Sequence, residues 1–290
     1  MTIELVQRLS ELEDRFDGLI LDVWGVVMDG TAPYSGARDC LAELRRRGKR
    51  VVLLSNAPRR DSQVVARLAE IGIEPGLYDR IVSSGEATRQ ALEARTDPAV
   101  AGFGRRYLYL GPERDRALLD GLDYAPSGMA EADFVLAIGI EDESDSVEKY
   151  HPLLKAAAAR GLVLVCANPD RVVVRQSGER VLCAGALAEA YEAIGGRALY
   201  FGKPHARIYK LCFDRLGGIA RDRILAVGDN LETDIAGARA VGLATVLVLG
   251  GVLAEALEIK WGESAPAARI EALCADHGIT PDLAIPALLW

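Results

Sequence analysis

The stretch GLILDVWG (Gly18–Gly25) is a short apolar run that ends in an aspartate. Its length and its Leu, Ile and Val content are typical of a buried strand over Gly18–Val23. The next segment, Ser35–Gly48, begins with a serine and ends with a glycine, as a helix with both caps does. A second apolar run follows over Arg50–Asn56. Strand, helix and strand in this order predict a parallel βαβ unit.

The same alternation continues through Asp61–Gly72, a predicted helix, and returns near the end of the chain. There, strands are predicted over Ala198–Lys203, Arg223–Asp229 and Ala244–Gly250, with a helix over Leu231–Val241 between the last two. Apolar runs bounded by polar residues indicate strands that are buried on both faces. We therefore expect an α/β fold with a doubly wound, Rossmann-like parallel sheet.

The middle of the chain repeats the α/β pattern with three further apolar runs, RRYLYLG, DFVLAIGI and LVLVCANPD. This region is long enough for a second small domain. We predict a core domain formed by residues 1–83 and 198–290, with an inserted α/β domain over residues 84–197.

Composition excludes several classes of protein. The formal net charge is −8, and half of the residues are hydrophobic. No apolar run reaches the roughly 18 residues of a membrane helix, and the N-terminus lacks the pattern of a signal peptide, so we expect a cytoplasmic protein without a membrane partner. The one basic cluster, Arg45–Arg50, lies at a predicted helix end, which favours a structural role over nucleic-acid binding. The five cysteines are widely scattered and are predicted to be buried thiols.

The segment Glu255–Trp290 departs from the strand–helix pattern and ends in the apolar sequence PALLW. It packs either on the core or on a neighbouring subunit, which leaves a homo-oligomer open.

Polar side chains follow the predicted strands in a suggestive order: Asp22, then Ser55 with Asn56, then Lys203, then Asp229 with Asp234. Each alone has an ordinary explanation as a cap or turn residue. Together, at the carboxyl ends of parallel strands, they suit phosphoryl transfer to a small phosphorylated substrate. One carboxylate can attack phosphorus, others can hold a hard cation, and the hydroxyl and ammonium can neutralise phosphoryl oxygens.

These residues lie in four motifs, LDVWGV, LLSN, FGKP and VGDNLETD, and the chain thereby resembles the haloacid-dehalogenase superfamily. The stretches LAIGIE, ANPDRVV and CAGAL resemble its class IIA branch, which contains 4-nitrophenyl, sugar and nucleotide phosphatases with an inserted cap. The resemblance implies that Asp22 is the nucleophile, that Ser55 binds phosphate, and that Lys203 is catalytic. It also implies a Mg²⁺ ion near Asp229 and Asp234.

Within the predicted cap, Asn168 and Asp170 stand at a strand end and are candidate substrate-binding residues, as is Gly185. An Asn-Pro-Asp tripeptide is equally a good turn by itself. Arg171 and Arg175 would suit an anionic part of the substrate, or would simply be solvated.

One residue departs from the family pattern. The family's phosphatases carry a second aspartate two residues after the nucleophile, and this chain has Trp24 there. That aspartate acts as the general acid and base, which an indole cannot do because its only polar group is an N–H donor. The metal site is less affected, since the resemblance assigns only the backbone carbonyl of this residue to Mg²⁺.

Three hypotheses follow from Trp24. The chain is a phosphatase that is slow, restricted to good leaving groups, or supplied with a proton by Asp29 or His205. Alternatively, it carries out non-phosphatase hydrolysis, or it binds a phosphorylated ligand as a sensor without turnover.

Overall fold

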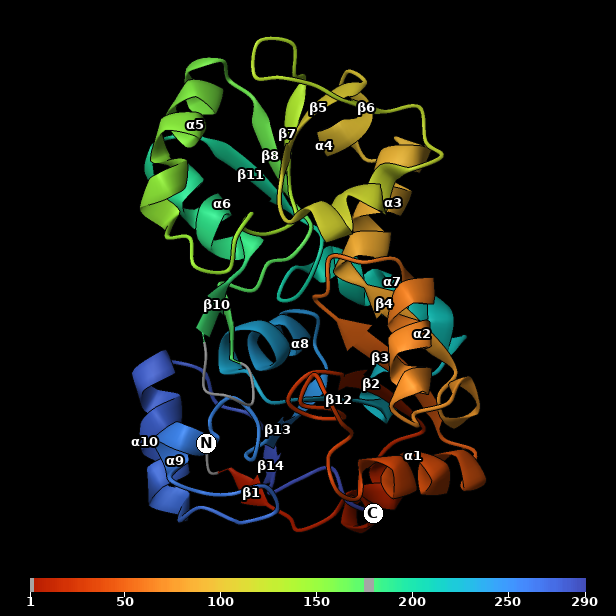
Figure 1. Cartoon of the computed structure of the whole chain (residues 1–290). Helices are drawn as coiled ribbons and strands as arrows, with labels where there is room; N and C mark the ends of the chain where they lie inside the picture. Colours follow the sequence, from red (N-terminus) through yellow and green to blue (C-terminus); the bar gives the residue numbers. More distant parts are fainter. Residues whose placement is uncertain (1–2, 175–179) are drawn as a thin grey trace. The chain divides into compact units, whose positions relative to one another are not determined.

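A computed structural model describes residues 3–174 and 180–290. Its internal contacts divide the chain into two compact units. The core unit comprises Met1–Ser55, Ser62–Val82 and Lys203–Trp290, and the inserted unit comprises Asn56–Asp61 and Ser83–Gly202. In Figure 1 the red-to-orange and blue parts of the chain share one unit, whereas the yellow-to-green part forms the other.

The core unit contains a seven-stranded sheet in the order β1-β14-β13-β12-β2-β3-β4. Neighbouring strands from β1 to β3 in this order pair in parallel. Strand β2 is buried along its whole length, as its apolar sequence predicts. The strands are β1 (Glu4–Leu5), β2 (Gly18–Asp22), β3 (Arg50–Ser55), β4 (Arg80–Ser83), β12 (Ile224–Gly228), β13 (Ala244–Val248) and β14 (Leu283–Ile285).

Helices pack on this sheet, with α1 and α7 against β3, and α8 against β13. The α-helices are α1 (Ala37–Arg46), α2 (Asp61–Glu70), α7 (Ala206–Leu216), α8 (Ala236–Ala240), α9 (Ala254–Leu257) and α10 (Ala267–His277). Short 3-10 helices are η1 (Leu9–Arg15), η2 (Pro75–Leu77) and η4 (Arg221–Arg223), and a π-helical turn, η5, covers Leu231–Ile235.

The basic cluster lies at the end of α1 and the start of β3, where most of its members pair with acids. Arg45 and Arg50 both contact Asp79, Arg46 contacts Glu43, and Arg47 contacts Glu13. These ion pairs agree with a structural role for the cluster.

The C-terminal segment packs on the core unit. Strand β14 pairs with β13 and β1, and the side chains of Ala287 and Leu288 are fully buried. Ile270 and Cys274 of α10 join a buried cluster that includes Leu247 of β13. Self-association of the chain stays a prediction.

The inserted unit has its own parallel sheet in the order β11-β8-β7-β5-β6. Its strands are β5 (Arg106–Leu110), β6 (Ala125–Pro126), β7 (Phe134–Ala137), β8 (Val163–Cys166) and β11 (Arg197–Tyr200), and β9 (Val172–Val174) pairs antiparallel with β10 (Arg180–Leu182). The helices are α3 (Ser84–Ala94), α4 (Pro98–Ala101), η3 (Glu113–Leu119), α5 (Val147–Ala159) and α6 (Ala184–Ala193).

The predicted assignment of Ala198–Tyr200 to the core sheet is wrong, because these residues belong to β11, which pairs with β8 in the inserted unit. Only Lys203 onward lies in the core unit. An edge strand is only partly buried, and β11 has no fully buried residue, so its short apolar pattern fits either sheet. The strand was correctly predicted, but its sheet was not.

All five cysteines are buried, which confirms their prediction as interior thiols. In the part of the chain that the structure describes, no helix is both long enough and apolar enough to cross a bilayer.

Candidate active site

The core sheet reverses its winding direction between β2 and β12. From β2 the sheet continues through β3 and β4, and from β12 it continues through β13 and β14. Leu21 pairs with Val227, and Asp22 pairs with Leu54. Asp22, Ser55 and Asp229 therefore stand within a residue or two of each other at the carboxyl edge. Open parallel sheets bind ligands at such a reversal point.

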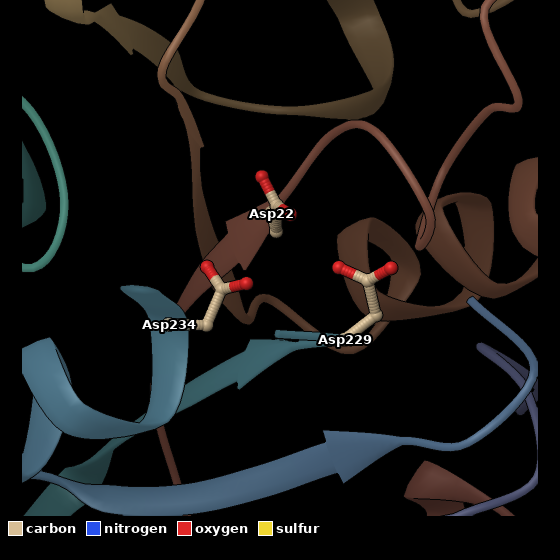
Figure 2. Close-up of side chains that lie close together, drawn as sticks. All are labelled: Asp22, Asp229 and Asp234. Atoms are coloured by element: carbon tan, nitrogen blue, oxygen red, sulfur yellow. The ribbon is translucent and has the colours of Figure 1, made fainter. Parts of the chain in front are cut away.

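Three carboxyl groups meet at this edge, from Asp22, Asp229 and Asp234. One oxygen atom of each lies within 4.8 Å of the others. The three residues are only 5–7 % exposed. Figure 2 shows them converging from the end of β2, the end of β12 and the turn that follows β12. The sequence prediction that these acids come together is thus matched by the geometry, and we refer to them as the acidic triad.

Asp234 reaches the triad through the π-helical turn η5. Its backbone N–H and that of Ile235 both donate to the Asn230 carbonyl, at 3.0 and 3.2 Å. The Asn230 side chain accepts from the N–H groups that open the turn. A Cβ on Gly228 would lie 2.2 Å from the Cβ of Asp234, so only glycine allows this approach. Wide turns of this kind are frequent at functional sites.

Asp229 is enclosed by backbone from two other segments. Its Oδ2 accepts a hydrogen bond from the Val252 N–H at 2.6 Å. A Cβ on Gly25 or on Gly251 would lie 2.0 or 2.2 Å from that oxygen. These two glycines were not predicted as site residues. The signal was present in both: each is a glycine just beyond the end of a predicted strand, next to the strand that carries Asp229.

Lys203 joins the triad from the segment that precedes α7. Its side chain is 4 % exposed. The ammonium donates to Asp22 Oδ1 and to Asp234 Oδ1, each at 2.6 Å. One buried cation therefore faces three buried carboxyl groups.

Burial and mutual repulsion raise the pKa values of this cluster. Burial, and then the charge of Asp234, raises the pKa of Asp22 well above its ordinary value, and Lys203 only partly opposes this. Burial, followed by Asp234, raises the pKa of Asp229 to about 7. A divalent cation would relieve this crowding of negative charge, and hard cations prefer carboxylate oxygen ligands. The residues present therefore fit a divalent metal ion.

Trp24 follows Asp22 by two residues and is 40 % exposed. Its ring lies against Gly30, where a Cβ would come within 2.2 Å of the indole Cη2. The exposed indole brings no acid or base to the site.

Of the two predicted substitute proton donors, Asp29 is made less suitable by its surroundings. Asp29 Oδ1 accepts from the N–H and hydroxyl of Thr31 and from the Ala32 N–H, each at 2.8 Å. Partial burial acts to raise the pKa of Asp29, but these hydrogen bonds outweigh it and the pKa is lowered. Asp29 is therefore a turn residue that stays ionised near neutral pH. His205 immediately precedes α7 as its N-cap residue, and a proton-donor role for it stays a prediction.

The remaining predicted site residues divide between the two units. Ser55 ends β3 in the core unit and is 8 % exposed. Asn56, Asn168 and Asp170 belong to the inserted unit, where the Asn56 amide donates to Asp170 Oδ1 at 2.8 Å.

The two arginines proposed for an anionic part of the substrate have different outcomes. Arg171 forms an exposed ion pair with Glu189 at 2.9 Å, as a solvated arginine would. Arg175 lies outside the described residues.

Comparisons with known proteins agree with this geometry. A family model described as haloacid dehalogenase-like hydrolase matches residues 19–125, and one described as HAD-hydrolase-like matches residues 200–275. Human chronophin is 31 % identical over 253 residues, which cover 84 % of each chain. The chain belongs to the haloacid-dehalogenase superfamily, in its class IIA branch. The ribonucleotide monophosphatase NagD of Escherichia coli is 30 % identical over 239 residues, covering 81 % of this chain and 88 % of that protein.

Solved structures of superfamily members confirm the α/β fold. A haloacid dehalogenase-like hydrolase from Brucella suis superposes with a TM-score of 0.82 at 34 % identity, covering 98 % of this chain and 100 % of that one. A p-nitrophenyl phosphatase from Archaeoglobus fulgidus has a TM-score of 0.72 at 25 % identity, with 94 % and 96 % covered. A glycerol phosphate phosphatase from Mycobacterium tuberculosis, in complex with calcium, has a TM-score of 0.63 at 27 % identity, with 83 % and 68 % covered.

Proposed function

We propose that this chain is a Mg²⁺-dependent phosphohydrolase that acts on a small phosphorylated metabolite through an aspartyl-phosphate on Asp22. The observation that carries the proposal is the buried acidic triad with Lys203 held between Asp22 and Asp234. The named activities of the relatives, which include nitrophenyl and nucleotide phosphatases, support it.

Asp22 is proposed to attack phosphorus, with the ester oxygen leaving with the bonding electron pair. Its Oδ1 accepts from Lys203 Nζ and from the Val23 N–H, so Oδ2 is the proposed attacking oxygen. The Lys203 ammonium, already within the cluster, would neutralise phosphoryl oxygens together with the Ser55 hydroxyl and the Asn56 segment. Hydrolysis of the aspartyl-phosphate then regenerates the Asp22 carboxylate.

Asp22, Asp229, Asp234 and the backbone carbonyl of Trp24 are the proposed metal ligands. Mg²⁺ bound there would supply charge neutralisation for the phosphoryl group. The structure of a relative with a similar fold contains calcium, which supports a divalent cation as the ligand of this site. We propose that the cation is magnesium.

The inserted unit is proposed to act as a cap, with Asn168 and Asp170 near the substrate. Cytoplasmic location, the absence of nucleic-acid and membrane partners, and possible self-association stay predictions from the sequence.

Trp24 sets the expected substrate range. Without a proton donor, an ester whose leaving oxygen needs protonation should react slowly, whereas an activated aryl ester should lose less of its rate. The same residue favours a second candidate function, a sensor that binds a phosphorylated ligand without turnover. The acidic triad counts against dehalogenation, a non-phosphatase hydrolysis that has no need of metal-binding acids.

A phosphate-release assay tests the proposal. Purified protein with Mg²⁺ should release phosphate from 4-nitrophenyl phosphate faster than from alkyl phosphates, and a chelator should stop the release. Asp214→Asn is the matched control for acid-to-amide substitutions, because Asp214 is an exposed residue of α7 paired only with Lys210 among the interactions described. If no ester is hydrolysed although Mg²⁺ and phosphate raise the melting temperature, the sensor function is favoured instead.

A further inference from the structure

The chain passes between its two units beside both proposed phosphate contacts. Ser55 is the last core-unit residue before Asn56, and Lys203 is the first core-unit residue after Gly202. Asn56 and Gly202 therefore form the inserted-unit ends of two crossover points. Because consecutive Cα atoms are only about 3.8 Å apart, whatever holds Asn56 and Gly202 also restrains Ser55 and Lys203.

Asn56 is held by a carboxylate of its own unit. Its Nδ2 donates to Asp170 Oδ1 at 2.8 Å, and Asn56 is 4 % exposed. A hydrogen bond to an ionised acceptor is stronger than one between neutral groups, and a buried amide that loses its acceptor is left with an unfavourable unpaired donor.

Gly202 packs against the same pair of segments. A Cβ at Gly202 would lie 2.4 Å from Asn56 Oδ1 and 2.7 Å from the Cδ of Pro169. One residue earlier, the Phe201 N–H donates to the Cys166 carbonyl at 3.3 Å. The second crossover thus lies directly on Asn56 and on the turn formed by Asn168, Pro169 and Asp170, which we call the NPD turn.

The NPD turn is itself anchored. The Asp170 N–H donates to Asn168 Oδ1 at 3.2 Å, and the Gly185 N–H at the start of α6 donates to the Asp170 carbonyl at 3.1 Å. A Cβ at Gly185 would lie 2.2 Å from the Pro169 carbonyl oxygen. Gly185, a predicted substrate-binding candidate, is thereby explained as a close-packing position for this turn.

We propose that Asp170 is a positioning residue, which through Asn56 and the NPD turn holds both crossovers in register and so sets the placement of Ser55 and Lys203. This inference rests on the proposed phosphatase function and replaces the direct substrate contact expected for Asp170. A carboxylate already engaged by a buried amide is poorly suited to bind an anionic substrate. A displacement of about 1 Å in a catalytic group can cost about 10²-fold in rate, so a tie one residue from both phosphate contacts has a large effect.

The hydrogen bond between Asn56 and Asp170 can be removed by substitution, and it can be restored with the donor and the acceptor exchanged between the two positions. Asp170→Ala and Asn56→Ala should each lower kcat by about ten- to hundredfold with all esters alike. The double variant should be no worse than either single one, because both remove the same tie. Asn56→Asp alone places two carboxylates together and should be at least as damaging. Adding Asp170→Asn to it restores a donor opposite an acceptor and should recover most of the loss.

Two measurements do not depend on turnover. Hydrogen exchange should rise in Asp170→Ala at residues 55–57 and at 201–204, and not only around the substituted turn. The affinity for inorganic phosphate with Mg²⁺, read by thermal shift, should fall. Glu189→Gln, which breaks only the exposed ion pair with Arg171, is the control and should change none of these.

Additive effects of the two alanine substitutions would overturn the proposal, as would a loss confined to the KM of particular esters. The first would mean that the two residues act separately, and the second that Asp170 contacts substrate. If wild type hydrolyses no ester, the proposed function fails, and hydrogen exchange and phosphate binding still decide the positioning role. Should the alanine variants not fold, the comparison of Asn56→Asp with the reversed pair remains decisive.

Discussion

The carboxyl ends of the two parallel sheets carry similar residues in different electrostatic situations. Beyond β2 and β12 of the core unit, three buried acids crowd around one lysine, and the pKa values of Asp22 and Asp229 are raised. Beyond β8 of the inserted unit, the NPD turn bonds internally and to Asn56 and Gly185. The acidic triad retains repulsion between carboxylates that a bound cation can relieve, which is typical of a functional site. The polar groups of the NPD turn are instead hydrogen-bonded, as in a structural site.

The largest expected effect is that of Asp22→Asn, which removes the proposed nucleophile. Phosphate release should fall by about 10⁴-fold or more, while the melting temperature is unchanged or raised because one crowded charge is gone. An activity assay checks the loss of phosphate release, and thermal unfolding checks the melting temperature. Asp170→Ala, by contrast, is expected to lower the free energy of unfolding by about 1–3 kcal/mol, because it removes a buried hydrogen bond. A similar loss in Asp22→Asn would contradict the difference between the two sheet ends.

Trp24→Asp should produce the next largest effect, in the opposite direction. Supplying the missing acid and base is expected to raise kcat by about 10²–10⁴-fold on alkyl phosphates, whose leaving oxygen needs a proton, and by much less on 4-nitrophenyl phosphate. Trp24→Asn is the matched control, because asparagine has nearly the shape of aspartate but cannot act as an acid or base. Full wild-type activity on alkyl phosphates, with no gain in the variant, would mean that another residue supplies the proton.

Gly228→Ala tests how the triad is assembled. The new methyl would collide with the Asp234 side chain, so we expect a loss of about 1–3 kcal/mol in stability together with weaker Mg²⁺ binding. Denaturant unfolding and metal titration measure the two effects. Gly48→Ala is the spatial control because nothing lies within 4 Å of its Cβ position, although its φ of +70° adds a backbone strain of its own. Unchanged metal affinity in Gly228→Ala would show that Asp234 is not a ligand.

The last prediction concerns pH. The pKa of Asp229 is raised to about 7 from its ordinary value of 3.8, so its protonated form stabilises the metal-free folded protein. That stabilisation is fully present below about pH 4 and is lost as the pH rises through about 7. Mg²⁺ must displace this proton, so titration of Asp229 alone should make the apparent Mg²⁺ affinity about thirtyfold higher at pH 8 than at pH 5.5, or about 2 kcal/mol. Mg²⁺-induced thermal shifts at the two pH values measure this, and equal shifts would contradict it.

Much of the core unit could be predicted because its signals are local and agree with one another. Asp22, Ser55 and Asp229 each end or follow a buried apolar run, and parallel strands necessarily bring such ends to one edge. The sequence pattern did not predict which neighbouring strand a predicted strand pairs with. The residues of β11 read correctly as a strand, yet only pairing with β8 shows that they belong to the inserted sheet.

The glycines around the triad show a second limit. Gly25 and Gly251 are far apart in sequence, and both enclose the same oxygen of Asp229. Glycine at a strand end predicts a turn, and the need for close approach appears only when the facing side chain is known. In the same way, the tripeptide at Asn168 predicts a turn but not that Asn56 is its partner.

The sequence by itself determined the α/β class, the order of the polar residues along the chain, and the replacement of an acid by Trp24. Residue identity and the period of apolar positions are local properties, so they can be read before the chain folds. Only the tertiary structure decided that Lys203 lies between Asp22 and Asp234, that burial raises the pKa of Asp229, and that Asp170 bonds to Asn56. Those facts depend on desolvation and on contacts between residues distant in sequence, which exist only once the strands have paired.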